Sequence, residues 1–302
     1  MKIFIIFVGA LHDRGFNQSA LDGATRMQAQ GKAKIEIVSG VPYDVVAMTQ
    51  ALDQAAQRSD GIVFIGGQGN LVVPKISASY PQKKFAIVQG NVTAANLASY
   101  DVLQEQSAFL AGVAAARLTC SGIVGHLSGH RVAPGLKGRA AFSAGLRHAN
   151  DGIDLITGFC GTQDDNSVTE AWVNGIAKAE ADILFTMLNG ARDGASAACR
   201  ATGMRQIGNA TNWCAVDPKV FIASAVTRID LGVERAVRDM LADHCPIQID
   251  QLGLADGAVA LTFAPDVAQS LRDEVKATAG LVIQRKLKVG TSYDGPEFEG
   301  PA

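Results

Sequence analysis

The sequence predicts an α/β protein made of two doubly wound, parallel-sheet lobes with a ligand cleft between them. Short apolar runs rich in β-branched residues alternate with helical stretches, and the runs are continuous, as expected for parallel strands covered on both faces. The alternation restarts near Gly122, and 302 residues suit two domains of about 150 residues each. The predicted lobes are residues 1–118 and 122–225, and residues 226–302 are expected to cross between the lobes and form a tail.

In the first lobe, one predicted helix has a clear apolar stripe. Residues 44–58 place Val45, Met48 and Leu52 on one face, and Pro42 suits the entrance of that helix. A second helix, residues 104–118, closes the lobe. The predicted strands of this lobe are residues 2–8, 34–38, 61–65 and 84–88.

In the second lobe and the segment after it, the same order returns. Two helices follow the last strand, at residues 229–243 and 266–279, and each has apolar residues on one face. The segment after Gly290 is acidic and rich in Gly and Pro, and we expect it to wrap the surface or fray. The predicted strands of this lobe are residues 123–127, 154–157, 182–187 and 221–226.

Composition limits the function classes. Lys and Arg number 27 against 29 Asp and Glu, so no basic field is available to bind nucleic acid. No apolar run reaches the roughly 18–20 residues of a membrane-spanning helix, and the N-terminal apolar segment reads as a strand rather than a signal peptide. We expect a periplasmic or membrane-anchored protein if an export signal naturally precedes this sequence, and a cytoplasmic one if Met1 is the native start.

Cysteine and histidine spacing predicts neither a metal site nor a cofactor. The five Cys residues contain no CxxC pair, so we expect buried or free thiols, and only Cys199 with Cys214 is considered for a disulfide. His126 and His130 lie at a strand end and a loop, which favours a satisfied or solvated pair over a metal site. No G-x-S-x-G or H-E-x-x-H motif is present, and we predict no catalytic residue.

The first candidate binding loops follow the first and third strands. In doubly wound sheets, ligands bind beyond the carboxyl ends of the strands. Phe16 could stack on a planar ligand and Asn17 could pair with its edge; packing of Phe16 and helix capping by Asn17 are equally compatible with the sequence. Gly67 and Gln68 lie in a glycine-rich loop that permits close backbone approach, although a plain tight turn is favoured over phosphate binding.

The next two loops offer neutral amides and hydroxyls. Gln89 and Asn209 each follow a strand, and such groups read a ligand's hydrogen-bonding pattern without requiring a charge. Trp213 could supply the opposite stacking face, or it could shield the hinge between the lobes. Asp165 or Asn166 is expected to cap a helix.

Two stretches carry a resemblance to a known family. Residues 15–24 (GFNQSALDGA) and 106–112 (QSAFLAG) resemble signature stretches of the basic membrane protein (BMP) family. Those proteins are substrate-binding proteins of ABC transporters with the type I periplasmic binding fold. Matches at residues 96–99, 122–125, 181–184 and 223–226 extend the resemblance, in order, over nearly the whole chain.

The resemblance implies two lobes that close on a small ligand, often a purine nucleoside. Similar nucleoside binders have an acidic residue at the end of the first strand, a Phe behind a Gly-Ser turn, and an Asp and a Lys on the ribose. The corresponding positions here are Phe7, Gln163, Asn209 and Thr227, and all four depart. The departures point to a free purine base or a similar neutral heterocycle, with the amides of Gln68 and Asn189 as further candidate partners.

Three functions compete at this point. The leading hypothesis is a monomeric, non-enzymatic receptor that captures a purine-like ligand for an ABC importer and docks on its membrane permease. The second is a cytosolic ligand sensor on the same fold. The third is an α/β enzyme acting on a nucleobase-like substrate, which would need a convergent acid–base or nucleophilic set that the sequence does not offer.

Overall fold

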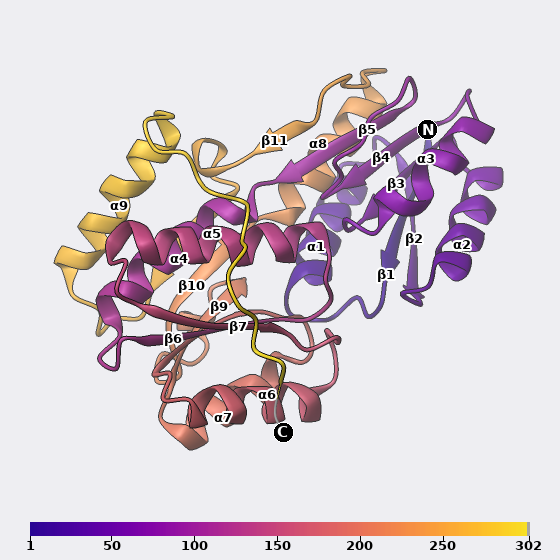
Figure 1. Cartoon of the computed structure of the whole chain (residues 1–302). Helices are drawn as coiled ribbons and strands as arrows, with labels where there is room; N and C mark the ends of the chain where they lie inside the picture. Colours follow the sequence, from indigo (N-terminus) through magenta and orange to yellow (C-terminus); the bar gives the residue numbers. More distant parts are fainter. Residues whose placement is uncertain (301–302) are drawn as a thin grey trace. The chain divides into compact units, whose positions relative to one another are not determined.

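The computed structural model describes residues 1–300, and it divides the chain into two compact α/β units. Unit 1 comprises Met1–Val102 and Arg228–Leu252, and unit 2 comprises Leu103–Thr227 and the chain from Gly253 onward. Each unit has one six-stranded sheet flanked by helices (Figure 1). The predicted α/β class with a parallel-dominated sheet in each half is confirmed.

Unit 1 is built on an all-parallel sheet of order β11-β5-β4-β3-β1-β2. Apolar side chains of β1, β3 and β4 form one core with α2 and α3, and α1 packs beside α8. The strands are β1 Lys2–Val8, β2 Lys34–Val41, β3 Gly61–Ile65, β4 Lys84–Val88, β5 Leu97–Val102 and β11 Asp250–Leu252. The helices are α1 Phe16–Ala29, α2 Val45–Arg58, α3 Gly69–Ser79 and α8 Ile229–Leu241.

Unit 2 has the sheet order β12-β10-β9-β8-β6-β7, in which only the β10–β12 pair is antiparallel among the described residues. Helices α4, α5 and α9 share one core, and α6 and α7 contribute to another. The strands are β6 Ile123–Ser128, β7 Asp154–Phe159, β8 Ile183–Met187, β9 Arg205–Ala210, β10 Phe221–Thr227 and β12 Val259–Phe263. The helices are α4 Gln104–Leu118, α5 Ala133–Ala149, α6 Asn166–Lys178, α7 Arg192–Thr202 and α9 Gln269–Ile283, with short 3-10 turns at Trp213–Ala215 and Leu254–Asp256.

The division of the chain differs from the one expected at residue 118, because α4 belongs to unit 2. A Cβ at Gly112 would overlap the carbonyl oxygen of Phe142, and a Cβ at Gly145 would overlap that of Phe109. The backbones of α4 and α5 therefore touch, which only glycine permits at both positions. This crossing ties α4 to α5 and sets the boundary after Val102.

Residues 228–252 return to unit 1 for a similar reason. A Cβ at Gly23 would lie 2.6 Å from the carbonyl oxygen of Asp230, so α1 and α8 approach closely. Arg26 donates from Nε to Glu234 at 2.6 Å and also pairs with Asp230. Both carboxylates are largely buried, so this pairing compensates for the water that they lose where α8 packs on α1.

Four strands were absent from the sequence prediction, namely β5, β9, β11 and β12. Strand β9 shows why: Gln206 in its interior is fully buried, and its amide bonds the hydroxyls of Ser196 and Thr186 at 2.8 and 2.9 Å. These side-chain bonds satisfy a polar strand in the interior, and a search for continuously apolar runs cannot find such a strand.

The cysteines are free thiols throughout the described chain, so Cys199 and Cys214 do not form the disulfide considered for them. Both lie buried in the core of unit 2. Burial raises the pKa of Cys199 to about 12, which keeps its thiol protonated.

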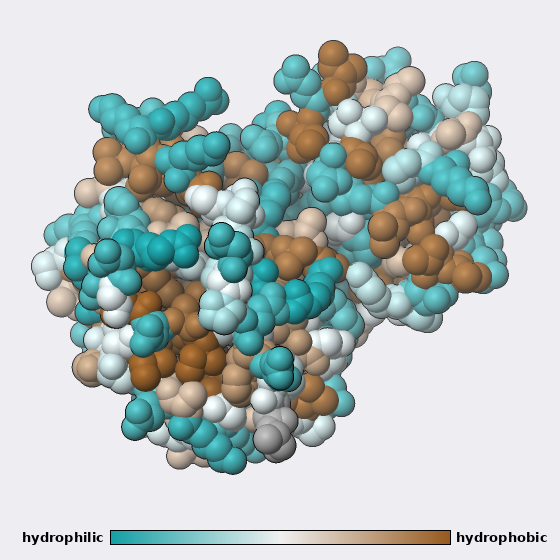
Figure 2. All heavy atoms as spheres, viewed as in Figure 1, coloured by the Kyte–Doolittle hydropathy of each residue, from teal (hydrophilic) through white to brown (hydrophobic). Residues whose placement is uncertain are grey.

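Apolar residues are exposed at a few places on the described surface. Figure 2 shows an apolar patch over α2 and α3 of unit 1, whose exposed apolar residues are Val45, Val46 and Leu71. Within residues 1–300, no helix combines the length and the apolar character needed to span a membrane.

Candidate functional site

The loop after β1 places Phe16 at the start of α1, at the carboxyl edge of the unit 1 sheet. Phe16 is half-buried. The carboxylate of Asp13 accepts the N–H groups of Gly15, Asn17 and Gln18 at 2.8–3.0 Å and so caps the helix. Sequence reasoning missed Asp13, although a carboxylate just before a helix is a recognisable capping signal.

Asn17 closes this loop. Its Nδ2 group donates to the carbonyls of Val8 and Ala10, both at 2.8 Å, and the residue is buried. The amide therefore joins the end of β1 to the first turn of α1 and fixes the backbone from which Phe16 projects. Of the two roles that the sequence left open for Asn17, these bonds favour the structural one, and Asp13 does the capping.

The loops after β3 and β4 lie side by side, because these strands are neighbours in the sheet. The amide of Gln68 bonds the carbonyl of Ile65 at 3.1 Å. Asn70 donates to the Gly67 carbonyl at 2.7 Å and accepts the N–H of Asn91 at 2.9 Å, so it links the two loops. The glycine-rich sequence of this loop did not indicate the bridging role of Asn70.

Gln89 follows β4 in a left-handed conformation with φ 69°. Its side chain accepts the N–H of Val102 at 2.7 Å and donates to the carbonyl of the same residue at 3.1 Å. Both ends of the amide therefore pair with β5. The side chain of Gln89 thus continues the hydrogen bonding between β4 and β5, at the carboxyl edge where a ligand was expected.

In unit 2, three predicted residues converge at the carboxyl ends of β7, β8 and β9. The Oε1 atom of Gln163 accepts the N–H of Asn189 at 3.1 Å. The Oδ1 atom of Asn209 accepts the N–H of Leu188 at 3.3 Å and an N–H of Arg192 at 3.2 Å. The bonds described for these two side chains use their oxygens and leave their amide N–H groups unused in these bonds.

Trp213 supports this cluster from behind. Its indole N–H donates to the carbonyl of Asn209 at 3.0 Å. The guanidinium of Arg192 lies 4.1 Å from the ring centroid, and the ring of Phe221 is 5.5 Å away at 30°. Protein groups therefore pack against this buried indole. No local sequence pattern distinguishes a buried arginine, so Arg192 was not predicted.

The two remaining positions from the nucleoside comparison are interior. Phe7 is fully buried in β1, and Thr227 is buried at the end of β10. His126 is also fully buried: its ring nitrogens bond the hydroxyls of Thr157 and Ser128 at 2.8 and 2.9 Å. It is a satisfied core histidine, one of the two interpretations that the sequence left open.

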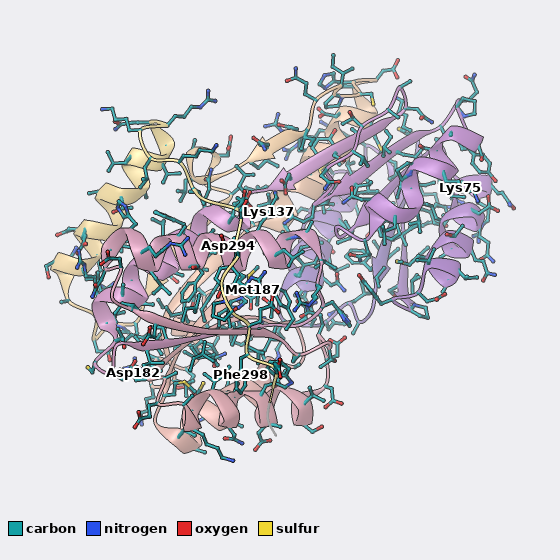
Figure 3. All side chains as sticks on the ribbon, viewed as in Figure 1. Lys75, Lys137, Asp182, Met187, Asp294 and Phe298 are labelled. Atoms are coloured by element: carbon teal, nitrogen blue, oxygen red, sulfur yellow. The ribbon has the colours of Figure 1, made fainter. Side chains whose placement is uncertain are left out.

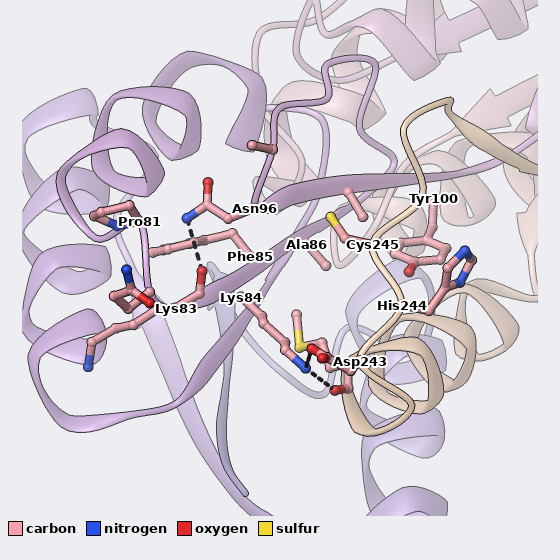
Figure 4. Close-up of a pocket in the computed structure, with 14 residues that line it drawn as sticks. Pro81, Lys83, Lys84, Phe85, Ala86, Asn96, Tyr100, Asp243, His244 and Cys245 are labelled. Atoms are coloured by element: carbon pink, nitrogen blue, oxygen red, sulfur yellow. Dashed lines mark hydrogen bonds and ion pairs between the residues drawn. The ribbon is translucent and has the colours of Figure 1, made fainter.

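A separate cavity of about 300 Å³ lies at the amino ends of β4 and β5, the opposite edge of the unit 1 sheet (Figure 4). Lys84 there pairs with Asp243 at 2.6 Å and donates to the carbonyl of Met240 at 2.7 Å. Burial raises the pKa of the Cys245 thiol, and burial with a bond to Asp239 raises that of Tyr100. The cavity contains none of the predicted ligand residues, and its thiol and phenol stay protonated.

Comparison with known proteins identifies the family to which the chain belongs. The sequence model of the PnrA-like ABC transporter substrate-binding proteins matches residues 1–292. The chain belongs to this family. Basic membrane protein B of Borreliella afzelii (strain PKo) is 25% identical over 99% of this chain and 90% of that protein.

Solved structures agree with this family at the level of fold. An ABC transporter solute-binding protein from Aeropyrum pernix K1 has a TM-score of 0.86 at 19% identity and covers 97% of this chain and 94% of its own. A transcriptional activator of the comK gene from Bacillus halodurans has a TM-score of 0.76 at 18% identity, covering 94% and 99%. The fold is that of type I periplasmic binding proteins, as the resemblance implied.

The family match bears on the function classes left open by the sequence. A match over residues 1–292 favours a substrate-binding protein of ABC transporters over a cytosolic sensor or a metabolic enzyme. Proteins of this class bind a small molecule and deliver it to a membrane permease.

Proposed function

We propose that the protein captures a small planar heterocycle of the purine-base class and delivers it to an ABC importer, acting outside the cytoplasm as a monomer and without enzymatic activity. The observation that carries the ligand class is the amide cluster of unit 2. Gln163 and Asn209 both have their oxygens engaged by protein N–H groups, so the amide donors are what they offer.

Amide donors match the acceptor atoms of a heterocycle. Ring nitrogens and carbonyl oxygens of a purine base accept hydrogen bonds in the plane of the ring, and neutral amides satisfy them without a charge. Phe16 offers an aromatic face at the edge of unit 1, and Asn189, whose backbone N–H bonds Gln163, is a further amide candidate in unit 2. Gly67 and Gln68 lie in the tight loop after β3, where the backbone can come close to a ligand at the carboxyl edge of unit 1.

The function is tested first by identifying what the protein carries. Native mass spectrometry of the purified protein should reveal a bound molecule of purine size, and denaturing extraction should release it intact. Purification of the protein with an abundant ligand of another class, such as a sugar or an amino acid, would contradict the proposed specificity.

The free base should bind more tightly than its nucleoside. The positions that correspond to the charged ribose partners of related nucleoside binders are neutral here, namely Asn209 and Thr227. Buried ribose hydroxyls without partners would each cost about 1–3 kcal/mol. Paired calorimetric titrations of adenine against adenosine and of hypoxanthine against inosine measure the ranking. Tighter binding of either nucleoside would identify an ordinary nucleoside receptor.

Phe16→Ala should weaken binding of the preferred base several-fold while the fold stays intact. Stacking on an aromatic face contributes about 0.5–1.5 kcal/mol beyond burial. Phe16→Leu is the matched control, because it keeps apolar packing and removes only the ring, so it should lose affinity with little change in melting temperature. Unchanged affinity in both variants, measured by calorimetry, would remove Phe16 from the site.

A further inference from the structure

The C-terminal strap, which we define as residues 293–300, packs on unit 2 and crosses the edge strand β7 (Figure 1). The N–H of Phe298 donates to the carbonyl of Thr157 at 2.8 Å, so the strap takes up a free position of the edge. The ring of Phe298 meets Trp172 edge-on at 5.7 Å. Of the two behaviours expected for the tail, wrapping is observed, and Asp294 and Phe298 mark its course in Figure 3.

The strap carries one carboxylate into a pair of arginines. Glu297 bonds Arg131, with Nη1 at 3.2 Å from Oε1, and it also bonds Arg131 Nη2 and Arg139 Nη1. The hydrogen bonds from Arg131, followed by those from Arg139, hold the pKa of Glu297 below its usual range. The Arg139 side chain is only 7% exposed, whereas that of Arg131 is 56% exposed.

Both guanidinium groups lie over the same ring. Arg131 is 4.7 Å and Arg139 is 5.0 Å from the centroid of Phe159, and Arg139 also lies 4.4 Å from the ring of Tyr293 on the strap. Two like charges on one aromatic ring repel each other, and an anion bonded to both offsets this repulsion. Glu297 is that anion, and a buried guanidinium such as Arg139 depends on it most.

The arginine pair connects to the loops that carry the ligand candidates. Arg131 lies between β6 and α5, and Phe159 is the last residue of β7. The loops after these two strands are paired by backbone bonds, from Cys160 to Ser128 at 2.9 Å and from Gly161 to Gly129 at 3.1 Å. The next residues lead to Gln163, whose side chain lies against Gly129.

We infer that Glu297 is a positioning residue for ligand binding: the strap, from outside the sheet, holds the loop at residues 129–132 and thereby sets the position of Gln163. Loss of the Glu297 charge leaves Arg139 buried and forces the exposed Arg131 away from Phe159. The loop then loosens, and Gln163 loses its support at Gly129. This inference rests on the proposed function for its effect on affinity, but its effect on the loop does not.

The test compares Glu297→Gln with the matched control Glu299→Gln, which removes an exposed charge two residues further along the same strap. Hydrogen–deuterium exchange should become faster in peptides covering residues 129–135 and 158–163 of Glu297→Gln only. The affinity for hypoxanthine, measured well below the melting temperature, should fall several-fold in the same variant, and Glu297→Asp should restore part of it.

Arg131→Gln provides a second variant that leaves the buried pair of Arg139 and Glu297 in place. It should loosen residues 129–135 to a similar degree without loss of the fold. If faster exchange in Glu297→Gln and Arg131→Gln is confined to residues 293–300, the strap is only an edge cover and the inference is overturned. If hypoxanthine binds neither the wild type nor any variant, the proposed ligand fails, and the exchange data still decide the role of Glu297.

Discussion

Replacement of Gly145 by alanine should destabilise unit 2 by about 3 kcal/mol or more, in the range that marks severe core disruption. A Cβ at this position would overlap the carbonyl oxygen of Phe109 and lie 3.0 Å from the backbone nitrogen of Val113. Both are backbone atoms of α4, so no side chain can rotate away and the two helices must separate. The shared core of α4 and α5, which includes Phe142, would then lose its packing.

The matched control is Gly280→Ala in α9, where a Cβ would meet no atom within 4 Å. That substitution should be neutral or stabilise by up to about 1 kcal/mol, because alanine has the higher helix propensity. Urea denaturation followed by circular dichroism measures both variants. Equal midpoints for Gly145→Ala and the wild type would show that α4 and α5 do not cross at these glycines.

The second large effect concerns acid stability and His126. Burial, followed by the charge of Arg139, lowers the pKa of this histidine from 6.5 to about 3. In the unfolded chain His126 therefore binds a proton below about pH 6.5, whereas in the folded state it binds one only below about pH 3. Stability from this group is fully present above pH 6.5 and falls by up to about 1.4 kcal/mol per pH unit as the solution is acidified.

His126→Phe should remove the contribution of this one proton to the pH dependence of the free energy of unfolding. At pH 7 the variant should lose about 1–3 kcal/mol, because the hydroxyls of Thr157 and Ser128 lose their partner. Between pH 6 and pH 4 its free energy of unfolding should decline less steeply than that of the wild type. Urea titrations at several pH values give both slopes, with His12→Phe, which replaces an exposed histidine, as the control. Parallel slopes for His126→Phe and the wild type would contradict a neutral, buried ring.

The position of the candidate amides was predictable, but their hydrogen-bonding roles were not. Gln89 and Gln163 follow strands, Asn209 lies near the end of β9, and parallel strands bring their carboxyl ends to one edge. Whether an amide faces a ligand depends on which backbone groups lie beside it. Both ends of the Gln89 amide bond Val102, whereas the oxygens of Gln163 and Asn209 accept bonds from protein N–H groups.

The docking of the strap and its ion pairs could not be predicted from the sequence. Arg131, Arg139 and Glu297 are separated by up to 166 residues, and no local pattern joins them. The sequence indicated an acidic tail that would wrap or fray. The choice between these depended on a free edge at β7 and on two arginines that need an anion.

The sequence by itself determined the α/β class, the restart of the fold near Gly122 and most strands, because continuous apolar runs report local burial on both faces. Tertiary structure alone decided the assignment of α4 to unit 2 and the return of residues 228–252 to unit 1. Both outcomes depend on close backbone approach at Gly112, Gly145 and Gly23, where contacts form between segments distant in the chain. A glycine in a sequence has the same appearance in a turn, a bulge or a helix crossing, and only the partner backbone distinguishes them.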